Sequence, residues 1–253
     1  NNLICYRCYN GQIKRIEPTQ ISANTPFSKN LFQDSGYVNV QDKTFDLSQD
    51  GVYRFYCLPR ISEQRIVCNN GLYSLLKMIG YLWQYGNKDD FHSLEKLLKK
   101  SEHQTLVLGC STQAKFSKAI LGYYNVESRL VACITTGPWS GQDDGHTLLE
   151  IKDKNGEWFV YDPSFQRYFP KISIIDLCKN HMLLKNFIHS PGQPGHGTFA
   201  HHKYQYSFWV EERLLSEDLL MKWYKRVLQV PLIYKDKIYH YPSSSVSLTQ
   251  TFK

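Results

Sequence analysis

The stretch from residue 106 to residue 163 places the tightest constraint on the fold of this chain. A short apolar run, Leu106–Leu108, ends at Gly109, and a helical pattern of apolar residues follows it as far as about Gly122. Residues 129–136 are rich in β-branched side chains and predict a strand. Two further strands are expected at 147–151 and 158–162, joined by a turn at Asn155-Gly156. A helix followed by an antiparallel hairpin predicts the α+β class.

Three chemically distinctive side chains fall at the ends of these expected elements. Cys110 lies in the first turn of the helix, His146 begins one strand, and Asp162 ends the next. If the two strands pair as a hairpin, the first residue of one lies close to the last residue of the other. At a helix start, free backbone N–H groups and the macrodipole favour a thiolate. We therefore expect the three side chains to meet.

A cysteine, a histidine and a carboxylate in this order suit nucleophilic catalysis. A thiol becomes a strong nucleophile near neutral pH when an imidazole takes its proton and a carboxylate holds the resulting imidazolium. Cys110 is accordingly the expected nucleophile, His146 the general base and then acid, and Asp162 the orienting carboxylate. This chemistry requires no cofactor.

Each of the three residues also has a purely structural interpretation. Cysteine is among the most buried residue types, so Cys110 after an apolar run is compatible with a core position. His146 could cap a hairpin, and Asp162 before Pro163 could simply begin a turn. The combination of all three at compatible positions favours catalysis over these separate explanations.

The motifs around these residues resemble those of the transglutaminase-like superfamily. They are Gly109-Cys110-Ser111, Asp144-Gly145-His146-Thr147 and Trp158-Phe159-Val160-Tyr161-Asp162-Pro163, and the resemblance covers roughly residues 104 to 165. It implies a papain-like core, in which a helix bearing the cysteine packs on an antiparallel sheet bearing the histidine and the aspartate. It also implies attack of a thiolate on a carbonyl, a thioester intermediate, and transfer of the acyl group to water or to an amine.

The resemblance also suggests positions for an oxyanion donor and for a substrate cleft. Gln104 precedes Cys110 by a separation similar to that between the glutamine and the cysteine of papain-like proteases, so it is the first candidate for the oxyanion hole. Transglutaminase relatives often use an upstream tryptophan, which makes Trp83 and Trp139 alternatives and candidates for the cleft wall. Each of these residues also has a structural alternative. Gln104 could be a solvated loop residue, Trp83 a core residue and Trp139 a loop anchor.

The patterns outside the central stretch predict a three-part organisation. Residues 1–68 form a β-rich extension with strands expected at 37–40 and 52–56, and residues 69–190 form the core, with further helices at 72–85, 91–100 and 172–187. Residues 191–253 form an appendage that completes the sheet through a helix at 214–228 and a hairpin at 232–241. At the junction of these two parts, a Gly- and Pro-rich loop at 190–197 is a candidate lid.

The charge pattern limits the expected partners. The net charge is +7, but the basic residues are spread along the chain, and two clusters, Lys96/Lys99/Lys100 and Lys222/Lys225/Arg226, have the spacing of solvated helix faces. We therefore expect no nucleic acid partner. The chain has no run of about eighteen apolar residues, so no membrane span is expected. The expected substrate is a peptide, a protein or a glycopeptide.

The other cysteines leave two interpretations open. The chain has seven cysteines, and Cys5 and Cys8 form a single C-x-x-C pair with Cys57 and Cys68 downstream. A zinc site would need two tight pairs, so no metal is predicted and a disulfide is somewhat more favoured. Three functions remain compatible with the sequence: hydrolysis of an amide, transfer of its acyl group to an amine, and non-catalytic binding of a glycan or a protein.

Overall fold

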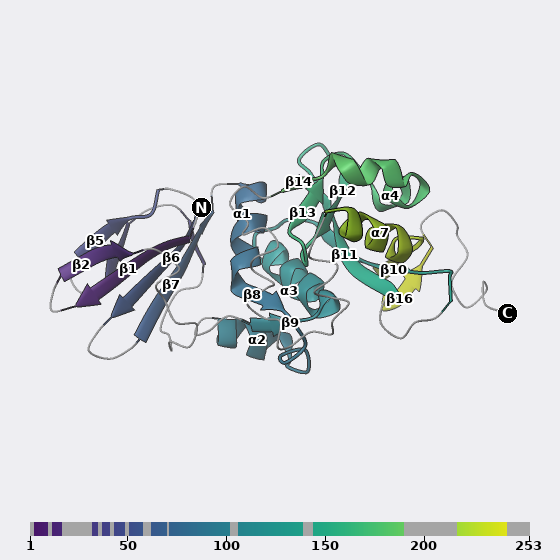
Figure 1. Cartoon of the computed structure of the whole chain (residues 1–253). Coiled ribbons are helices and arrows are strands. Elements are labelled where there is room, and N and C mark those ends of the chain that lie inside the picture. Colours follow the sequence, from purple (N-terminus) through teal and green to yellow (C-terminus); the bar gives the residue numbers. More distant parts are fainter. Residues whose placement is uncertain are drawn as a thin grey trace. The chain divides into compact units, whose positions relative to one another are not determined.

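The computed structural model describes residues 3–9, 12–16, 32–34, 37–40, 43–48, 51–57, 62–69, 71–101, 106–138, 144–189 and 217–241. The described residues within Asn1–Val107 form one compact unit, and those within Leu108–His189 and Pro194–Lys253 form a second. Figure 1 labels most of their helices and strands. Both units contain helices and strands, which confirms the predicted α+β class.

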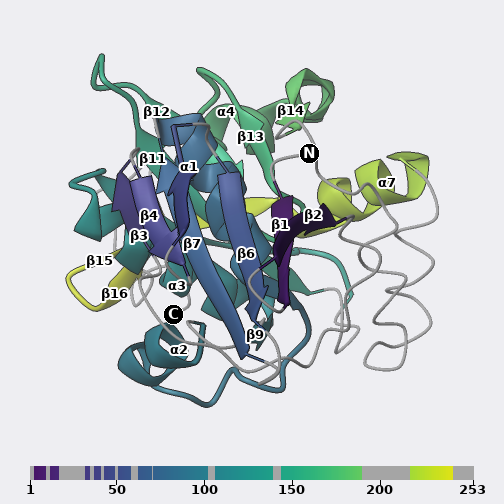
Figure 2. The ribbon, with the colours of Figure 1, turned by 90° about the vertical axis from the view of Figure 1, so that its left-hand side faces the viewer.

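The first unit contains a mixed sheet. Strands β1 (Leu3–Tyr9), β2 (Gln12–Ile16), β3 (Phe32–Asp34), β6 (Gly51–Cys57) and β7 (Ser62–Asn69) pair in the order β2-β1-β6-β7-β3. Figure 2 shows β7, β6, β1 and β2 side by side. A separate hairpin joins β4 (Tyr37–Val40) to β5 (Lys43–Asp46), so strands are present where the sequence predicted them at 37–40 and 52–56. The helices α1 (Leu72–Ile79) and α2 (Leu94–Ser101) follow, with β8 (Trp83–Tyr85) between them.

The second unit is organised around an antiparallel sheet, which has seven strands among the described residues. In sequence order they are β10 (Ser128–Ile134), β11 (Gly145–Lys152), β12 (Trp158–Asp162), β13 (Arg167–Phe169), β14 (Ile188–His189), β15 (Val230–Lys235) and β16 (Ile238–His240). The order in the sheet is β14-β13-β12-β11-β10-β15-β16. The C-terminal hairpin therefore pairs with β10, directly beside the strand that carries His146.

Helices complete the second unit. After β9 (Leu106–Leu108), helix α3 (Cys110–Tyr123) packs on β10 and β11. Helix α4 (Ile174–Lys179), a 3₁₀ turn (His181–Asn186) and helix α7 (Glu217–Val227) share a buried cluster with the sheet, and α4 and α7 are labelled in Figure 1. This cluster includes Val131, Cys133, Leu148, Val160, Leu177, Leu220, Trp223, Tyr224 and Val227. Burial of so much apolar surface stabilises the unit.

Two predicted helices are shorter than their apolar patterns suggested. The helix expected over 72–85 ends at Ile79, because a 3₁₀ turn begins at Gly80 and the backbone of Trp83 is extended (φ −139°, ψ 168°). The helix expected over 91–100 begins at Leu94, where the Ser93 hydroxyl accepts a hydrogen bond from the backbone N–H of Lys96. A local capping group thus sets this helix start.

The single helix expected over 172–187 is divided in two. Asn180 has an extended backbone (φ −136°, ψ 90°) after α4, and its side chain accepts a hydrogen bond from the N–H of Met182 at the start of the 3₁₀ turn. The spacing of apolar residues along the sequence does not reveal where a side chain interrupts a helix by hydrogen bonding to the backbone. The loop predicted at 190–197, with its suggested lid function, lies outside the described residues.

Candidate active site

Cys110 is the first residue of α3. Gly109 before it is extended (φ −77°, ψ 167°), and the backbone N–H of Gln113 donates to the Gly109 carbonyl at 2.9 Å to close the first turn. The Gln113 side chain also donates to the carbonyl of Leu108 at 2.7 Å, which fixes the passage from β9 into the helix. Cys110 is partly exposed. Its thiol therefore lies at the positive end of a helix.

The hairpin of β11 and β12 brings His146 and Asp162 together. His146 is the second residue of β11 and Asp162 the last residue of β12, and the register pairs Leu149 with Tyr161. Because side chains alternate along a strand, this register directs His146 and Asp162 to the same face. The imidazole Nε2 lies 3.0 Å from Asp162 Oδ2, and both side chains are buried. The proximity predicted from the spacing of the two residues is therefore observed.

Gly145 allows β11 to approach β10 closely just before His146. A Cβ at this position would lie 2.6 Å from the backbone carbonyl oxygen of Cys133. The pairing of Cys133 with His146 in the next register position depends on this approach. Glycine is therefore required here by contact with the neighbouring backbone.

Asp162 accepts three hydrogen bonds in a site that is closed to solvent. Oδ2 accepts from His146 and, at 2.6 Å, from the hydroxyl of Tyr224, while Oδ1 accepts the backbone N–H of Ser164 at 2.8 Å. Burial raises the pKa of Asp162, but the charge and hydrogen bond of His146, then Tyr224 and Ser164, outweigh it and lower the pKa below its ordinary value. Asp162 is thus an ionised buried carboxylate.

The imidazole of His146 lies among aromatic rings. Its centroid is 4.8 Å from that of Trp223 in an edge-on arrangement and 6.4 Å from that of Phe165. The rings of Phe165 and Trp223 contact each other with centroids 5.4 Å apart. Such contacts restrict the rotation of the imidazole and exclude water from it.

The ionisation of Cys110 and His146 is mutually favourable. Burial raises the pKa of the Cys110 thiol, but the hydrogen bond and charge of His146, together with the backbone N–H of Thr147, hold it below its ordinary value. Burial likewise lowers the pKa of His146, yet the charge of Asp162 and the hydrogen bonds to Asp162 and Cys110 raise it to about 9. These directions are those of a thiolate paired with an imidazolium.

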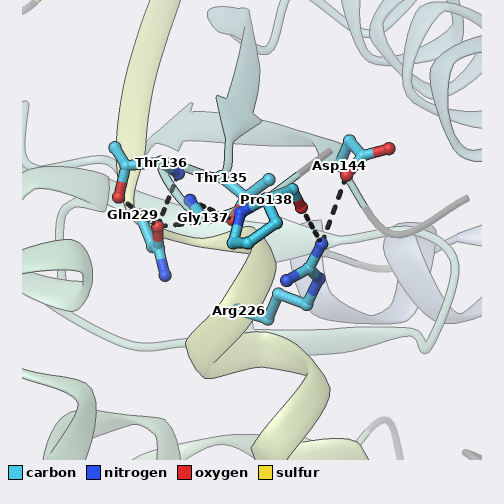
Figure 3. A network of polar contacts seen from close by, with 7 residues as sticks. All are labelled: Thr135, Thr136, Gly137, Pro138, Asp144, Arg226 and Gln229. Carbon is cyan, nitrogen blue, oxygen red and sulfur yellow. Dashed lines mark hydrogen bonds and ion pairs between the residues drawn. The ribbon is translucent and has the colours of Figure 1, made fainter. Parts of the chain in front are cut away.

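A second polar network holds the segments on either side of the loop that leads to His146 (Figure 3). Arg226, near the end of α7, donates to the Pro138 carbonyl at 2.9 Å and to Asp144 Oδ1 at 3.2 Å. The Gln229 side chain accepts the backbone N–H of Thr136 at 2.6 Å and its hydroxyl at 2.7 Å. The C-terminal part of the second unit therefore fixes both ends of this loop.

The described structure does not test the predicted auxiliary residues. Gln104 and Trp139 lie outside the described residues. Trp83 is buried in β8 of the first unit, whereas Cys110 belongs to the second. The oxyanion and cleft assignments of these three residues remain predictions.

Sequence reasoning missed Tyr224, Trp223 and Phe165, which contact His146 or Asp162. Tyr224 and Trp223 lie in the helix predicted at 214–228, and their regular apolar spacing there indicates only core packing. Phe165 follows Asp162 closely, but a turn residue carries no signal of its own. Long-range packing was needed to identify all three.

Two members of the basic clusters form ion pairs with buried carboxylates, whereas the sequence predicted solvated helix faces. Lys100 forms an ion pair with the buried Asp89, and Arg226 pairs with Asp144. A nearby buried carboxylate attracts the cation in each case. The remaining four lysines, Lys96, Lys99, Lys222 and Lys225, are exposed as expected.

Neither a membrane-spanning helix nor a metal-binding cluster is present among the described residues. None of the helices in the described ranges is both long and apolar enough to cross a membrane. Within the same ranges, no group of three or more His, Cys, Asp or Glu side chains could hold a metal ion. Cys110, Cys133 and Cys178 are free thiols, while the side chains of Cys5, Cys8, Cys57 and Cys68 lie outside the description.

Comparisons with protein-family models, with curated proteins and with solved structures gave no match to this chain. Any functional assignment therefore depends on the geometry and chemistry of its own residues.

Proposed function

We propose that the second unit is a papain-like, cysteine-dependent acyl-transfer enzyme that hydrolyses an amide through a thioester on Cys110. One observation carries the proposal: His146 Nε2 lies 3.0 Å from the buried Asp162 carboxylate, and the same imidazole holds the pKa of the Cys110 thiol below its ordinary value. A chain of thiol, imidazole and carboxylate is the arrangement that activates a cysteine nucleophile.

Acylation would begin with attack of the Cys110 thiolate on the amide carbonyl carbon. The C=O π electrons move to oxygen, and the backbone N–H groups in the first turn of α3 can stabilise the oxyanion that forms. When the intermediate collapses, the C–N bond breaks and the His146 imidazolium gives its proton to the departing amine. The products of this step are a thioester on Cys110, a free amine and a neutral imidazole.

Deacylation would use the neutral imidazole as a base. His146 takes a proton from water as the water oxygen attacks the thioester carbonyl, and the C–S bond then breaks to release a carboxylic acid and the Cys110 thiolate. Asp162 stabilises the imidazolium each time it forms, because its carboxylate is already hydrogen-bonded on both oxygens. If an amine replaces water, the same steps give a new amide.

The test is the pH dependence of iodoacetamide labelling at Cys110, measured by peptide mass spectrometry in the native protein and in His146→Gln. We expect rapid labelling with a midpoint well below the free-thiol value of about 8.5, and loss of this fast reaction in the variant. Cys178, another partly exposed thiol of the same unit, provides an internal reference for alkylation. Slow labelling of Cys110 at a rate that His146→Gln does not change would refute the proposal.

Reaction products distinguish the two acyl acceptors. A library of peptides and glycopeptides is incubated with the protein in the presence and absence of a biotinylated primary amine, and acylated Cys110 is sought by intact mass. Release of carboxylic acid supports hydrolysis. Stable incorporation of biotin, with little acid formed, would replace hydrolysis by amine transfer at the same site.

A further inference from the structure

Tyr224 lies at the far end of the hydrogen-bond chain that begins at Cys110. Its hydroxyl donates to Asp162 Oδ2 at 2.6 Å, and the same oxygen lies 3.0 Å from His146 Nε2. Tyr224 belongs to α7 and is separated from Asp162 by 62 residues. A single carboxylate oxygen is thus held by groups from two distant parts of the chain.

The surroundings of Tyr224 leave its hydroxyl little freedom to move. The side chain is fully buried, and its ring centroid lies 5.7 Å from that of Phe165 and 5.2 Å from that of Trp223. These neighbours also contact the imidazole of His146. The hydroxyl is therefore a fixed donor, because the packing around the ring sets its position.

The hydrogen bonds to Asp162 fix the plane of its carboxylate. Oδ1 accepts the N–H of Ser164 at 2.8 Å while Oδ2 accepts the Tyr224 hydroxyl. Rotation of the carboxylate would break both bonds inside a site closed to water, where a lost hydrogen bond is not replaced by solvent. Without the hydroxyl, only the Ser164 N–H and His146 itself would orient the group.

We propose that Tyr224 is a positioning residue, whose hydroxyl keeps Asp162 Oδ2 directed at His146 and so keeps the imidazole charged and paired with Cys110. Its importance for catalysis rests on the proposed function. Its effect on Asp162 and His146 does not, since these contacts exist whether or not Cys110 reacts.

The test is the pKa of His146, measured by NMR titration of the full chain. A Cys110→Ala background removes the contribution of the thiolate, and Tyr224→Phe then removes only the hydroxyl while keeping the ring. The His146 signal is the one that disappears in His146→Gln. We expect the pKa to fall by up to about one unit in Tyr224→Phe, because a carboxylate that is free to rotate stabilises the imidazolium less.

Two control substitutions make the result specific. Tyr168→Phe removes a hydroxyl from another buried tyrosine of the same unit and should leave the His146 pKa unchanged. 4-Fluorophenylalanine at position 224 fills more of the space of the hydroxyl without donating, so it should reproduce the fall even if Tyr224→Phe does not fold. 4-Aminophenylalanine, which restores a donor, should recover most of the wild-type value.

An unchanged His146 pKa in both donor-free variants would overturn the proposal. A rise would overturn it as well, because it would mean that Tyr224 competes with the imidazole for Asp162 instead of orienting the carboxylate. Either result leaves the proposed function open to its own test, since iodoacetamide labelling of Cys110 in the otherwise wild-type chain is measured independently.

Discussion

Replacing Cys110 with serine should make the stability of the second unit fall as the pH rises from 6.5 to 8.5. In the wild-type fold, the lowered pKa of Cys110 and the raised pKa of His146 leave one proton bound to the pair. An unfolded chain with a neutral thiol and a neutral imidazole binds the same number between their ordinary pKa values of about 6.5 and 8.5. Cys110 and His146 together therefore contribute no pH dependence to the free energy of unfolding in this range. Stability changes with pH only when the folded and unfolded states bind different numbers of protons.

In Cys110→Ser no thiol loses a proton on folding, so the proton gained by the His146 imidazole is no longer offset. Its pKa is raised to about 9 in the wild-type fold, and Asp162 is the largest cause that raises it. A raised histidine pKa stabilises the fold fully below the unfolded value of about 6.5, and this stability is lost as the pH rises through the folded value. The slope cannot exceed about 1.4 kcal/mol per pH unit, and removal of the Cys110 charge lowers the folded pKa below about 9, so the variant should lose about 1 to 2 kcal/mol between pH 6.5 and 8.5.

Urea unfolding at closely spaced pH values, followed by circular dichroism, measures this loss. The free energies of Cys110→Ser are compared with those of the double variant Cys110→Ser/His146→Gln, so that other titrating groups cancel. The difference between the two variants should decline with increasing pH. A difference that stays constant would refute a charged His146 held by Asp162.

Two further predictions concern the elements that place His146. Gly145→Ala should lower the free energy of unfolding by about 2 kcal/mol and abolish fast alkylation of Cys110, because the new methyl group would collide with the Cys133 carbonyl. Normal alkylation with unchanged urea unfolding would show that β10 and β11 do not need a glycine at this close contact. Arg226→Met keeps the aliphatic stem but loses the hydrogen bonds to Pro138 and Asp144, so it should cost about 1 kcal/mol in urea unfolding. Equal unfolding midpoints for Arg226→Met and the wild type would contradict that role.

The central part of the site could be predicted from sequence because its geometry is local. His146 and Asp162 are separated by a single hairpin, and a hairpin fixes which residues face each other once its turn is recognised. The turn itself carries clear signals: Gly156 adopts a positive φ of 85°, and the Asp153 side chain accepts the N–H groups of Asn155 and Glu157. The place of Cys110 at a helix start followed from Gly109 and the apolar period after it.

The remainder of the site depends on packing that no local pattern encodes. Tyr224 recurs with Leu220 and Val227 at helical spacing, so its position predicts a core residue as well as a hydrogen-bond donor. The pairing of β15 with β10 joins the C-terminal segment to the sheet. The division of the 172–187 helix was also missed, because one capping side chain at Asn180 outweighs a continuous apolar pattern.

The distance along the chain between Asp162 and Tyr224 has a consequence during protein synthesis. Cys110, His146 and Asp162 are all synthesised before α7 and β15. A ribosome-bound chain that ends before Glu217 therefore contains these three groups. It lacks the helix that contacts Asp162 and the strand that pairs with the edge of β10. An incomplete chain therefore cannot hold the imidazole as the finished one does.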